Sequence, residues 1–186
     1  MAFLAKVFKA LLPFIVAAAF VGLVQVSKSW VVENVPFHDS VVILPWLDGW
    51  LNLTYIHNSG AAFGIFPQAN LVFIVVAVAV VVVILFYFRY LPSDGLLVRI
   101  SLGLQLGGAL GNLIDRLRYG YVVDFLQIGF TRSLPLTTNN VADFAIVGGV
   151  ILLGYYLLFT APRQHVPVEA SGGEAPGPVE EPSGED

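Results

Sequence analysis

The sequence predicts an all-α membrane protein with four transmembrane helices and a small β-sheet on one side of the bilayer. Hydrophobic residues make up 57% of the 186-residue chain and charged residues only 12%, whereas about a quarter of residues are charged in soluble domains. Four stretches also approach the roughly 20 apolar residues that a helix needs to cross a bilayer. They are residues 10–27, 69–88, 97–115 and 142–161.

The first span, 10–27, is preceded by Lys6 and Lys9. Basic residues also precede the apolar run of a secretory signal peptide, but no small-x-small cleavage site follows here and three further spans do. We therefore interpret 10–27 as a transmembrane helix. An even number of spans puts both chain ends on one side, and the two lysines beside the first helix place that side in the cytoplasm.

The second span and residues 144–161 of the fourth carry no charge, whereas the third, 97–115, is weakly apolar because Gln105 and Asn112 interrupt it. Its glycines follow a regular pattern: Gly103, Gly107 and Gly111 recur every four residues. Such spacing puts small residues on one helix face and allows close contact between helices. The same face continues to Asp115. The third helix is therefore expected to be sheltered by its neighbours and to end in a polar cluster.

Between the first two spans, residues 38–57 alternate between apolar and polar types around Asp48-Gly49. This pattern predicts a short β-hairpin. Its Trp and Tyr residues suit a sheet lying at the level of the lipid headgroups, and a sheet packed on the helix ends is an equal alternative. We expect the hairpin to be extracytoplasmic.

Residues 163–186 differ from the rest of the chain, because they are rich in Pro, Gly, Ser and Glu. Six carboxylates and one arginine give this segment a charge of −5. The formal charge of the whole chain is −4, so residues 1–162 carry +1. The segment cannot bury enough apolar surface to fold, so it is expected to be a disordered acidic cytoplasmic tail. The chain has no cysteine, which excludes thiol nucleophiles and thiolate metal sites.

Three acidic residues, Asp115, Asp124 and Asp143, lie near the ends of the third and fourth spans. An ionisable side chain at membrane depth is costly, so each is a candidate functional residue. Each also has a structural interpretation. Asp115 would pair with Arg116, Asp124 would make turn hydrogen bonds, and Asp143 would be a first-turn acid in a helix capped by Asn139 or Asn140.

Asp124 and Asp143 both have apolar neighbours, which favours paired acid–base chemistry. Two carboxyl groups that share a site tend to hold one proton between them. One member then takes a proton from water while the other donates to a carbonyl oxygen, which suits hydrolysis of a peptide bond. Spacing in the sequence does not establish that the two residues meet. A transporter or proton relay, or a scaffold with polar helix contacts, are the alternatives, although the acids cluster at one edge and no internal repeat is visible.

Three segments resemble the signature blocks of lipoprotein signal peptidase, the bacterial signal peptidase II. They are "HNSGAAFGIF" (57–66), "GGALGNLIDRLRYGYVVDFL" (107–126) and "NNVADFAI" (139–146). The resemblance implies that residues 1–162 form a four-helix intramembrane aspartyl endopeptidase in the bacterial cytoplasmic (inner) membrane. Such an enzyme removes the signal peptide from diacylglyceryl-modified prolipoproteins, N-terminal to the lipidated cysteine. It also implies an active site near the outer leaflet and a lid, here about residues 127–138.

Residue by residue, the resemblance makes Asp124 and Asp143 the catalytic pair. The residues expected to bind the substrate backbone, or globomycin-type inhibitors, are Asn58, Asn112, Arg116 and Asn140. Asp115 and Lys28 are expected to be structural polar residues. A monomer in contact with membrane lipids is expected, without cofactor, metal or nucleic acid. In one departure, Val24 stands where the family usually has Asp, while Gln25 and Lys28 remain.

The two aspartates are also expected to differ in acidity. Burial at membrane depth raises the pKa of a carboxyl group and so keeps one member protonated. The dipole at the start of the fourth helix acts in the opposite direction on Asp143. The sequence therefore predicts that Asp143 ionises more readily than Asp124.

Overall fold

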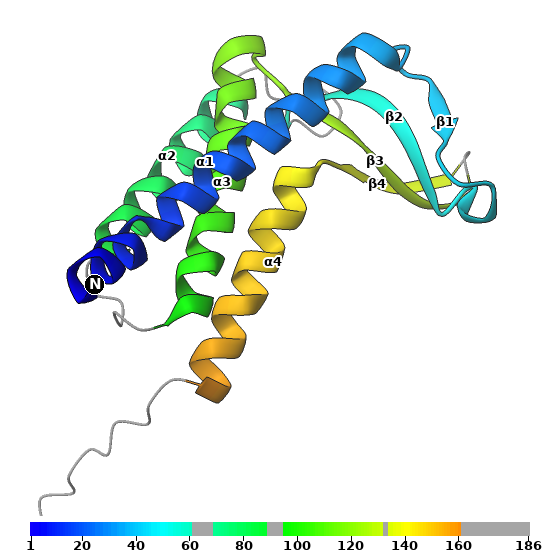
Figure 1. Ribbon diagram of the computed structural model, residues 1–186. Coiled ribbons are helices and arrows are strands. Elements are labelled where there is room, and N and C mark those ends of the chain that lie inside the picture. The colour runs from blue at the N-terminus through cyan, green and yellow to red at the C-terminus, as the bar shows by residue number, and fades with distance from the viewer. Residues whose placement is uncertain (61–68, 89–94, 132–133, 161–186) are drawn as a thin grey trace, which may run out of the picture.

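The computed structural model describes residues 1–60, 69–88, 95–131 and 134–160. In these residues, four helices form a bundle and a four-stranded antiparallel sheet lies at one end of it (Figure 1). The helices are α1 (Ala2–Asn34), α2 (Ala69–Phe88), α3 (Leu96–Tyr119) and α4 (Val141–Tyr155), the last continued by the π-helical turn η3 (Tyr156–Thr160). The predicted tail lies outside the described residues.

Three helical segments are long and apolar enough to cross a membrane: Phe3–Asn34, Leu96–Tyr119 and Val141–Thr160. A shorter apolar segment, Asn70–Phe86, lies within α2. The expectation of a helical membrane protein with a small sheet is confirmed, and the predicted second span, 69–88, stays a prediction. The 33 residues of α1 correspond to about 50 Å of helix, more than a hydrocarbon core of about 30 Å requires. The helix therefore extends past the predicted 10–27 at both ends.

Glycines bring α3 into close contact with both of its long neighbours. A Cβ atom on Gly107 would lie 3.0 Å from the carbonyl oxygen of Ala17 in α1, and one on Gly108 would lie 2.5 Å from that of Ala142 in α4. Larger residues at these positions would push the helices apart. The predicted role of the glycine spacing is thus confirmed for α1. The contact at Gly108 also brings the first turn of α4 against α3.

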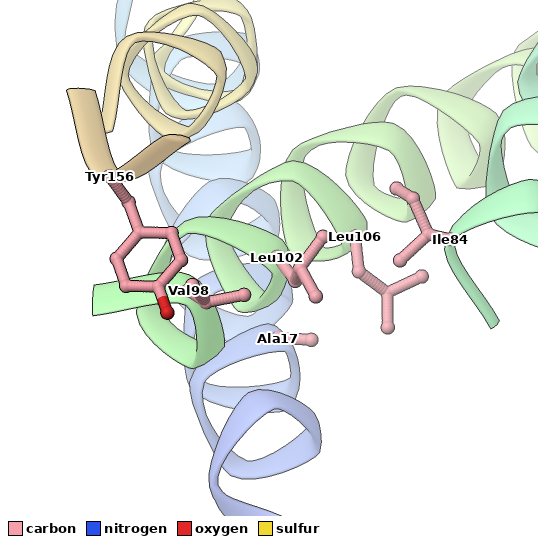
Figure 2. Packing of buried hydrophobic residues seen from close by; sticks show 6 residues of the cluster. All are labelled: Ala17, Ile84, Val98, Leu102, Leu106 and Tyr156. Carbon is pink, nitrogen blue, oxygen red and sulfur yellow. The ribbon is translucent and has the colours of Figure 1, made fainter. Parts of the chain in front are cut away.

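Apolar side chains between the helices form a core away from the sheet. Figure 2 shows Leu102 and Leu106 of α3 directed towards Ala17 and Ile84, with Val98 beside Tyr156. A second cluster joins α1 to the sheet and consists of Val31, Val35, Tyr55, Val123 and Phe125. This second cluster holds the sheet on the end of α1.

The strands are β1 (Ser40–Val42), β2 (Leu51–Asn58), β3 (Val122–Thr131) and β4 (Leu134–Asn139), and they lie in that order in the sheet. β1 and β2 form the predicted hairpin, in which Ser40 pairs with Thr54. The connection contains the short 3₁₀ helix η1 (Pro45–Leu47) and Gly49, whose φ of 85° lies in the left-handed region that favours glycine.

Of the two alternatives that the sequence left open, packing of the sheet on the helix ends is confirmed, and a position at the lipid headgroups stays a prediction. One face packs on the end of α1 through the second cluster, while Trp46 and Trp50 of the hairpin are 76% and 58% exposed. The sequence did not predict β3 and β4, which include most of the segment expected to be the lid, about residues 127–138. Movement of that segment stays a prediction.

Candidate active site

Asp124 lies in β3, where it pairs with Ile56 of β2. Asp124 is only 2% exposed, so both of its carboxylate oxygens need partners within the protein. Asn58 Nδ2 donates to Oδ2 at 2.7 Å and Asn140 Nδ2 donates to Oδ1 at 2.6 Å. Two asparagines from different elements therefore orient this carboxyl group.

Asp143 is the third residue of α4 and forms a capping box with Asn140, the N-cap. Asn140 Oδ1 accepts from the backbone N–H of Ala142 at 2.8 Å, and the backbone N–H of Asn140 donates to Asp143 Oδ2 at 3.0 Å. The other oxygen, Oδ1, accepts from Asn112 Nδ2 of α3 at 2.8 Å. Of the two caps that the sequence offered, Asn139 and Asn140, the structure has Asn140.

Asn140 connects the two carboxyl groups, because its side-chain nitrogen donates to Asp124 and its backbone nitrogen donates to Asp143. The first residues of a helix have backbone N–H groups without intrahelical partners. The start of α4 therefore supplies one donor to each aspartate. This places the two predicted catalytic residues at the same helix end.

The amide orientation of each of the three asparagines is determined by its oxygen. Asn58 Oδ1 accepts from the N–H of Gly60, Asn112 Oδ1 accepts from Lys28 Nζ, and Asn140 Oδ1 accepts from the helix backbone. An amide that accepts through oxygen must present its NH₂ group elsewhere. In all three, the NH₂ group donates to Asp124 or Asp143.

The protonation of Asp124 is biased by its surroundings. Burial raises the pKa of its carboxyl group above the ordinary value, and the negative charge of Asp143 adds to the rise. The hydrogen bonds from Asn140 and Asn58 lower it, because they stabilise the ionised form. The net effect is upward, so Asp124 keeps its proton to a higher pH than an exposed aspartate does.

A buried ion pair lies next to the two aspartates. Lys28 Nζ is 2.7 Å from Asp115 Oδ2, with side chains 3% and 1% exposed, and it also donates to Asn112 Oδ1 at 2.7 Å. Asp115 accepts further from the N–H of Val123 at 3.0 Å and from Gln25 Nε2 at 3.1 Å. The structural interpretation of the sequence had paired Asp115 with its neighbour Arg116. In the structure Asp115 pairs with Lys28 instead.

Val24 replaces the aspartate usual in the family without leaving Lys28 unpaired. Its side chain is fully buried and packs against Gly111 of α3, where a Cβ atom would lie 2.8 Å from Val24 Cγ1. Lys28, one turn further along α1, has Asp115 and Asn112 as partners. The substitution therefore makes the α1–α3 contact apolar at this level and leaves the ion pair in place.

Arg116 differs from the other predicted site residues because it contacts α2. Its guanidinium lies 4.7 Å from the centroid of the Phe73 ring, and its Nη1 is 3.5 Å from Asn70 Oδ1. Among the described residues no carboxylate forms an ion pair with it. Asn70 was not predicted as a site residue. The only indication in the sequence was that it is a single amide at the start of an apolar span. Nor did it assign a role to Gln25.

The described residues bring seven of the eight predicted site residues into one hydrogen-bonded network, which contains Lys28, Asn58, Asn112, Asp115, Asp124, Asn140 and Asp143. Arg116 lies beside it, on the face of α3 towards α2. No group of three His, Cys, Asp or Glu side chains suited to a metal ion occurs among the residues the structure describes.

The chain is similar in sequence to proteins of one known family. Residues 16–159 match the family model described as signal peptidase (SPase) II. The lipoprotein signal peptidase of Moorella thermoacetica is 48% identical over 154 residues, which cover 82% of this chain and 97% of that protein. That of Symbiobacterium thermophilum is 39% identical, covering 80% and 95%.

Two solved structures have a similar fold. A bacterial membrane enzyme determined by the in meso method superimposes with a TM-score of 0.70 at 29% identity, covering 80% of this chain and 94% of that one. A second structure described in the same terms gives a TM-score of 0.67 at 30% identity, covering 78% and 87%.

Proposed function

This chain belongs to the signal peptidase II family of aspartic-type peptidases, and we propose that Asp124 and Asp143 are its catalytic pair. The observation that carries the proposal is the double role of Asn140, which donates to one carboxyl group from its side chain and to the other from its backbone. A transporter or proton relay, the alternative function, is not supported by the family or by the relatives.

The substrate is a bacterial prolipoprotein that carries a diacylglyceryl group, and the bond cut lies N-terminal to the lipidated cysteine. The names of the relatives support this class. A precursor anchored by acyl chains presents its scissile bond close to the headgroups. Asp143 in the first turn of α4 and Asp124 in β3 belong to elements that meet where the helix bundle joins the sheet (Figure 1), and we place this end of the bundle at the depth of that bond.

The reaction begins with Asp124 protonated and Asp143 ionised. The raised pKa of Asp124 supports this distribution, because the shared proton then resides on Asp124. Asp143 takes a proton from water as the water oxygen bonds to the scissile carbonyl carbon, while Asp124 gives its proton to the carbonyl oxygen. The product of this step is a neutral gem-diol.

The second step restores the enzyme. Asp143 gives its newly acquired proton to the amide nitrogen as the carbon–nitrogen bond breaks. One gem-diol hydroxyl returns its proton to Asp124 as the carbonyl re-forms. The released products are a carboxylic acid and an amine, and no covalent intermediate is formed with the protein.

The surrounding polar residues take distinct roles. Asn58, Asn112 and Asn140 orient the carboxyl groups through the hydrogen bonds described above. The remaining N–H groups of Asn58 and Asn112, which are not buried, are available to substrate carbonyl oxygens. Arg116 carries a positive charge beside the pair and has no carboxylate partner among the described residues. We assign it to the substrate backbone carbonyls that flank the scissile bond.

The chain crosses the cytoplasmic membrane four times, with both termini in the cytoplasm and the sheet on the outer surface. The 20 residues of α2 correspond to about 30 Å of helix, which matches the thickness of the hydrocarbon core. Lys6 and Lys9 at the start of α1 support the orientation.

Separate Asp124→Asn and Asp143→Asn variants test the proposal, in membranes that contain diacylglyceryl-modified precursor. Both variants are expected to accumulate uncut precursor at normal protein level, with initial rates at least about 10³-fold below wild type, because each aspartate acts in both proton transfers. Asp39→Asn, on an exposed residue of the hairpin region, is the matched control and should process normally. Full processing by either dyad variant would refute the assignment.

A further inference from the structure

A polar pocket of about 230 Å³ lies between α1 and α3 at the end of the bundle next to the sheet. Its polar lining comes from one stripe of each helix: Gln25, Lys28, Ser29 and Glu33 of α1, and Asp115, Arg118 and Tyr119 of α3. Residues three and four apart share a helix face. The Lys28–Asp115 ion pair of this lining also belongs to the hydrogen-bonded network of the candidate site, whereas Asn112 and Arg116 of α3 do not line the pocket.

The pocket opens where the two helices diverge. The glycine contacts end at Gly111, which packs on Val24, and the next residue on that face is Asp115. Beyond this point α1 and α3 separate towards the sheet (Figure 1). The pocket lies between the separated ends, with the buried Lys28–Asp115 ion pair as its floor.

The mouth carries one residue of each charge. Glu33 and Arg118 are both exposed, and within the described part of the chain neither forms an ion pair. Arg118 lies over the ring of Tyr119, 5.1 Å from its centroid. Because Lys28 and Asp115 neutralise each other, the lining as a whole is neutral, with a cation and an anion left at the opening. Such a site is complementary to a zwitterion.

Two exposed aromatic residues near the mouth indicate a position at the level of lipid headgroups. Trp30 of α1 is 53% exposed and Tyr119 of α3 is 44% exposed, and exposed Trp and Tyr mark the membrane interface. Below Trp30, α1 presents an apolar face on which Leu23 and Val26 are 53% and 69% exposed. A molecule with a polar zwitterionic head and a hydrocarbon chain would contact both regions together.

We propose that this pocket binds the headgroup of a zwitterionic phospholipid with a primary ammonium group. Arg118 binds the phosphodiester through its planar donors, Glu33 binds the ammonium, and Ser29 donates to a phosphate oxygen. An acyl chain lies along Leu23 and Val26. A volume of about 230 Å³ is smaller than that of pockets for drug-sized ligands and suits a headgroup.

Occupancy would affect the catalytic network through the pocket floor. Lys28 donates to Asn112, and Asn112 donates to Asp143. A headgroup that bridges Glu33 and Arg118 would hold the outer ends of α1 and α3 at one separation. The bound lipid is thus a structural ligand of the enzyme, and its site is separate from that of the acylated substrate.

Native mass spectrometry of the full chain, released from micelles containing equal phosphatidylethanolamine and phosphatidylglycerol, tests the proposal. Wild type is expected to retain one phosphatidylethanolamine in preference to phosphatidylglycerol. Arg118→Gln should weaken retention about tenfold, since a charge-assisted hydrogen bond is lost. Ser29→Phe keeps every charge but fills the pocket, and should weaken retention similarly.

Two further variants and a competition experiment sharpen the test. Glu33→Gln should still retain lipid but lose the preference for the ethanolamine headgroup, while Lys6→Gln, at the far end of α1, should behave as wild type. Thermal unfolding of each variant establishes that it is folded. Equal retention by wild type, Arg118→Gln and Ser29→Phe would overturn the proposal. So would inorganic phosphate or free phosphoethanolamine displacing the lipid at equal concentration, which would make the ligand a soluble phosphate.

Discussion

Replacement of Asn140 by serine separates the two tasks of this residue. Serine caps helices about as well as asparagine, so the hydrogen bond to the N–H of Ala142 is retained. The shorter side chain cannot reach Asp124, which loses the 2.6 Å donor to Oδ1. The backbone N–H that donates to Asp143 is unaffected. The variant therefore removes one hydrogen bond of the proposed pair and little else.

The size of the effect follows from the charge on Asp124 during the reaction. In the ground state Asp124 is neutral, and a neutral hydrogen bond contributes about 0.5–1.5 kcal/mol. After it gives up its proton the same bond is made to an anion, which raises the contribution to about 1.5–3 kcal/mol. The difference, about 1–1.5 kcal/mol, is lost only in the transition state and lowers kcat roughly tenfold.

The assay measures kcat and KM on a diacylglyceryl-modified precursor peptide in lipid nanodiscs, with chemical unfolding measured in parallel. We expect kcat to fall with the free energy of unfolding reduced by no more than about 1 kcal/mol. Asn139→Ser is the matched control, because Asn139 Nδ2 donates to Thr137 Oγ1 and not to the pair. A kcat for Asn140→Ser within twofold of wild type, or an equal loss in the control, would refute the role of Asn140.

Three further outcomes are expected. Lys28→Met should lower the free energy of unfolding by about 3 kcal/mol or more, because Asp115 is then buried without its cation. Adding Asp115→Leu should restore stability but not activity. Chemical unfolding measures the stability, and precursor cleavage measures the activity. Gly108→Ala should cost about 1–3 kcal/mol, since its Cβ would meet backbone of α4, whereas Gly148→Ala, with open space around it, should not destabilise. Asn58→Ala removes a hydrogen bond that lowers the pKa of Asp124, so that pKa rises further. Asp124 then stays protonated to higher pH, and the alkaline limb of kcat/KM should move up; a downward move would contradict the assignment of Asp124 as proton donor.

The parts of the fold that depend on local pattern could be predicted from the sequence. Apolar runs indicated the helices, and the glycines of α3 indicated close contact with a neighbour, because both signals repeat within one helix. The capping of α4 by an asparagine was also predictable, although the sequence left Asn139 and Asn140 as alternatives and the structure has Asn140. β3 and β4 were not predicted. Their apolar residues lie beside a membrane helix, and their pairing depends on segments far away in the chain.

The same distinction applies to the candidate site. The position of Asp124 depends on its register opposite Ile56 of β2, which no local pattern reveals. Asp115 was expected to pair with Arg116, but adjacent residues on a helix point in different directions. Its actual partner, Lys28, lies 87 residues away on α1. The glycine face of α3 led to Asp115, yet nothing in the sequence identified the facing residue.

The choice of donors around the two aspartates follows from the need to share one proton. A lysine in contact with Asp143 would favour its ionised form and hold it there through the cycle. In this structure Lys28 is neutralised by Asp115, and the neutral amide of Asn112 lies between Lys28 and Asp143. Asparagine donates to a carboxylate without carrying a full charge, so it orients both groups while leaving each free to gain and lose the proton. Asn112→Lys should therefore abolish turnover, because the lysine would keep Asp143 ionised and prevent it from taking the proton of the attacking water. Asn112→Gln should retain measurable cleavage.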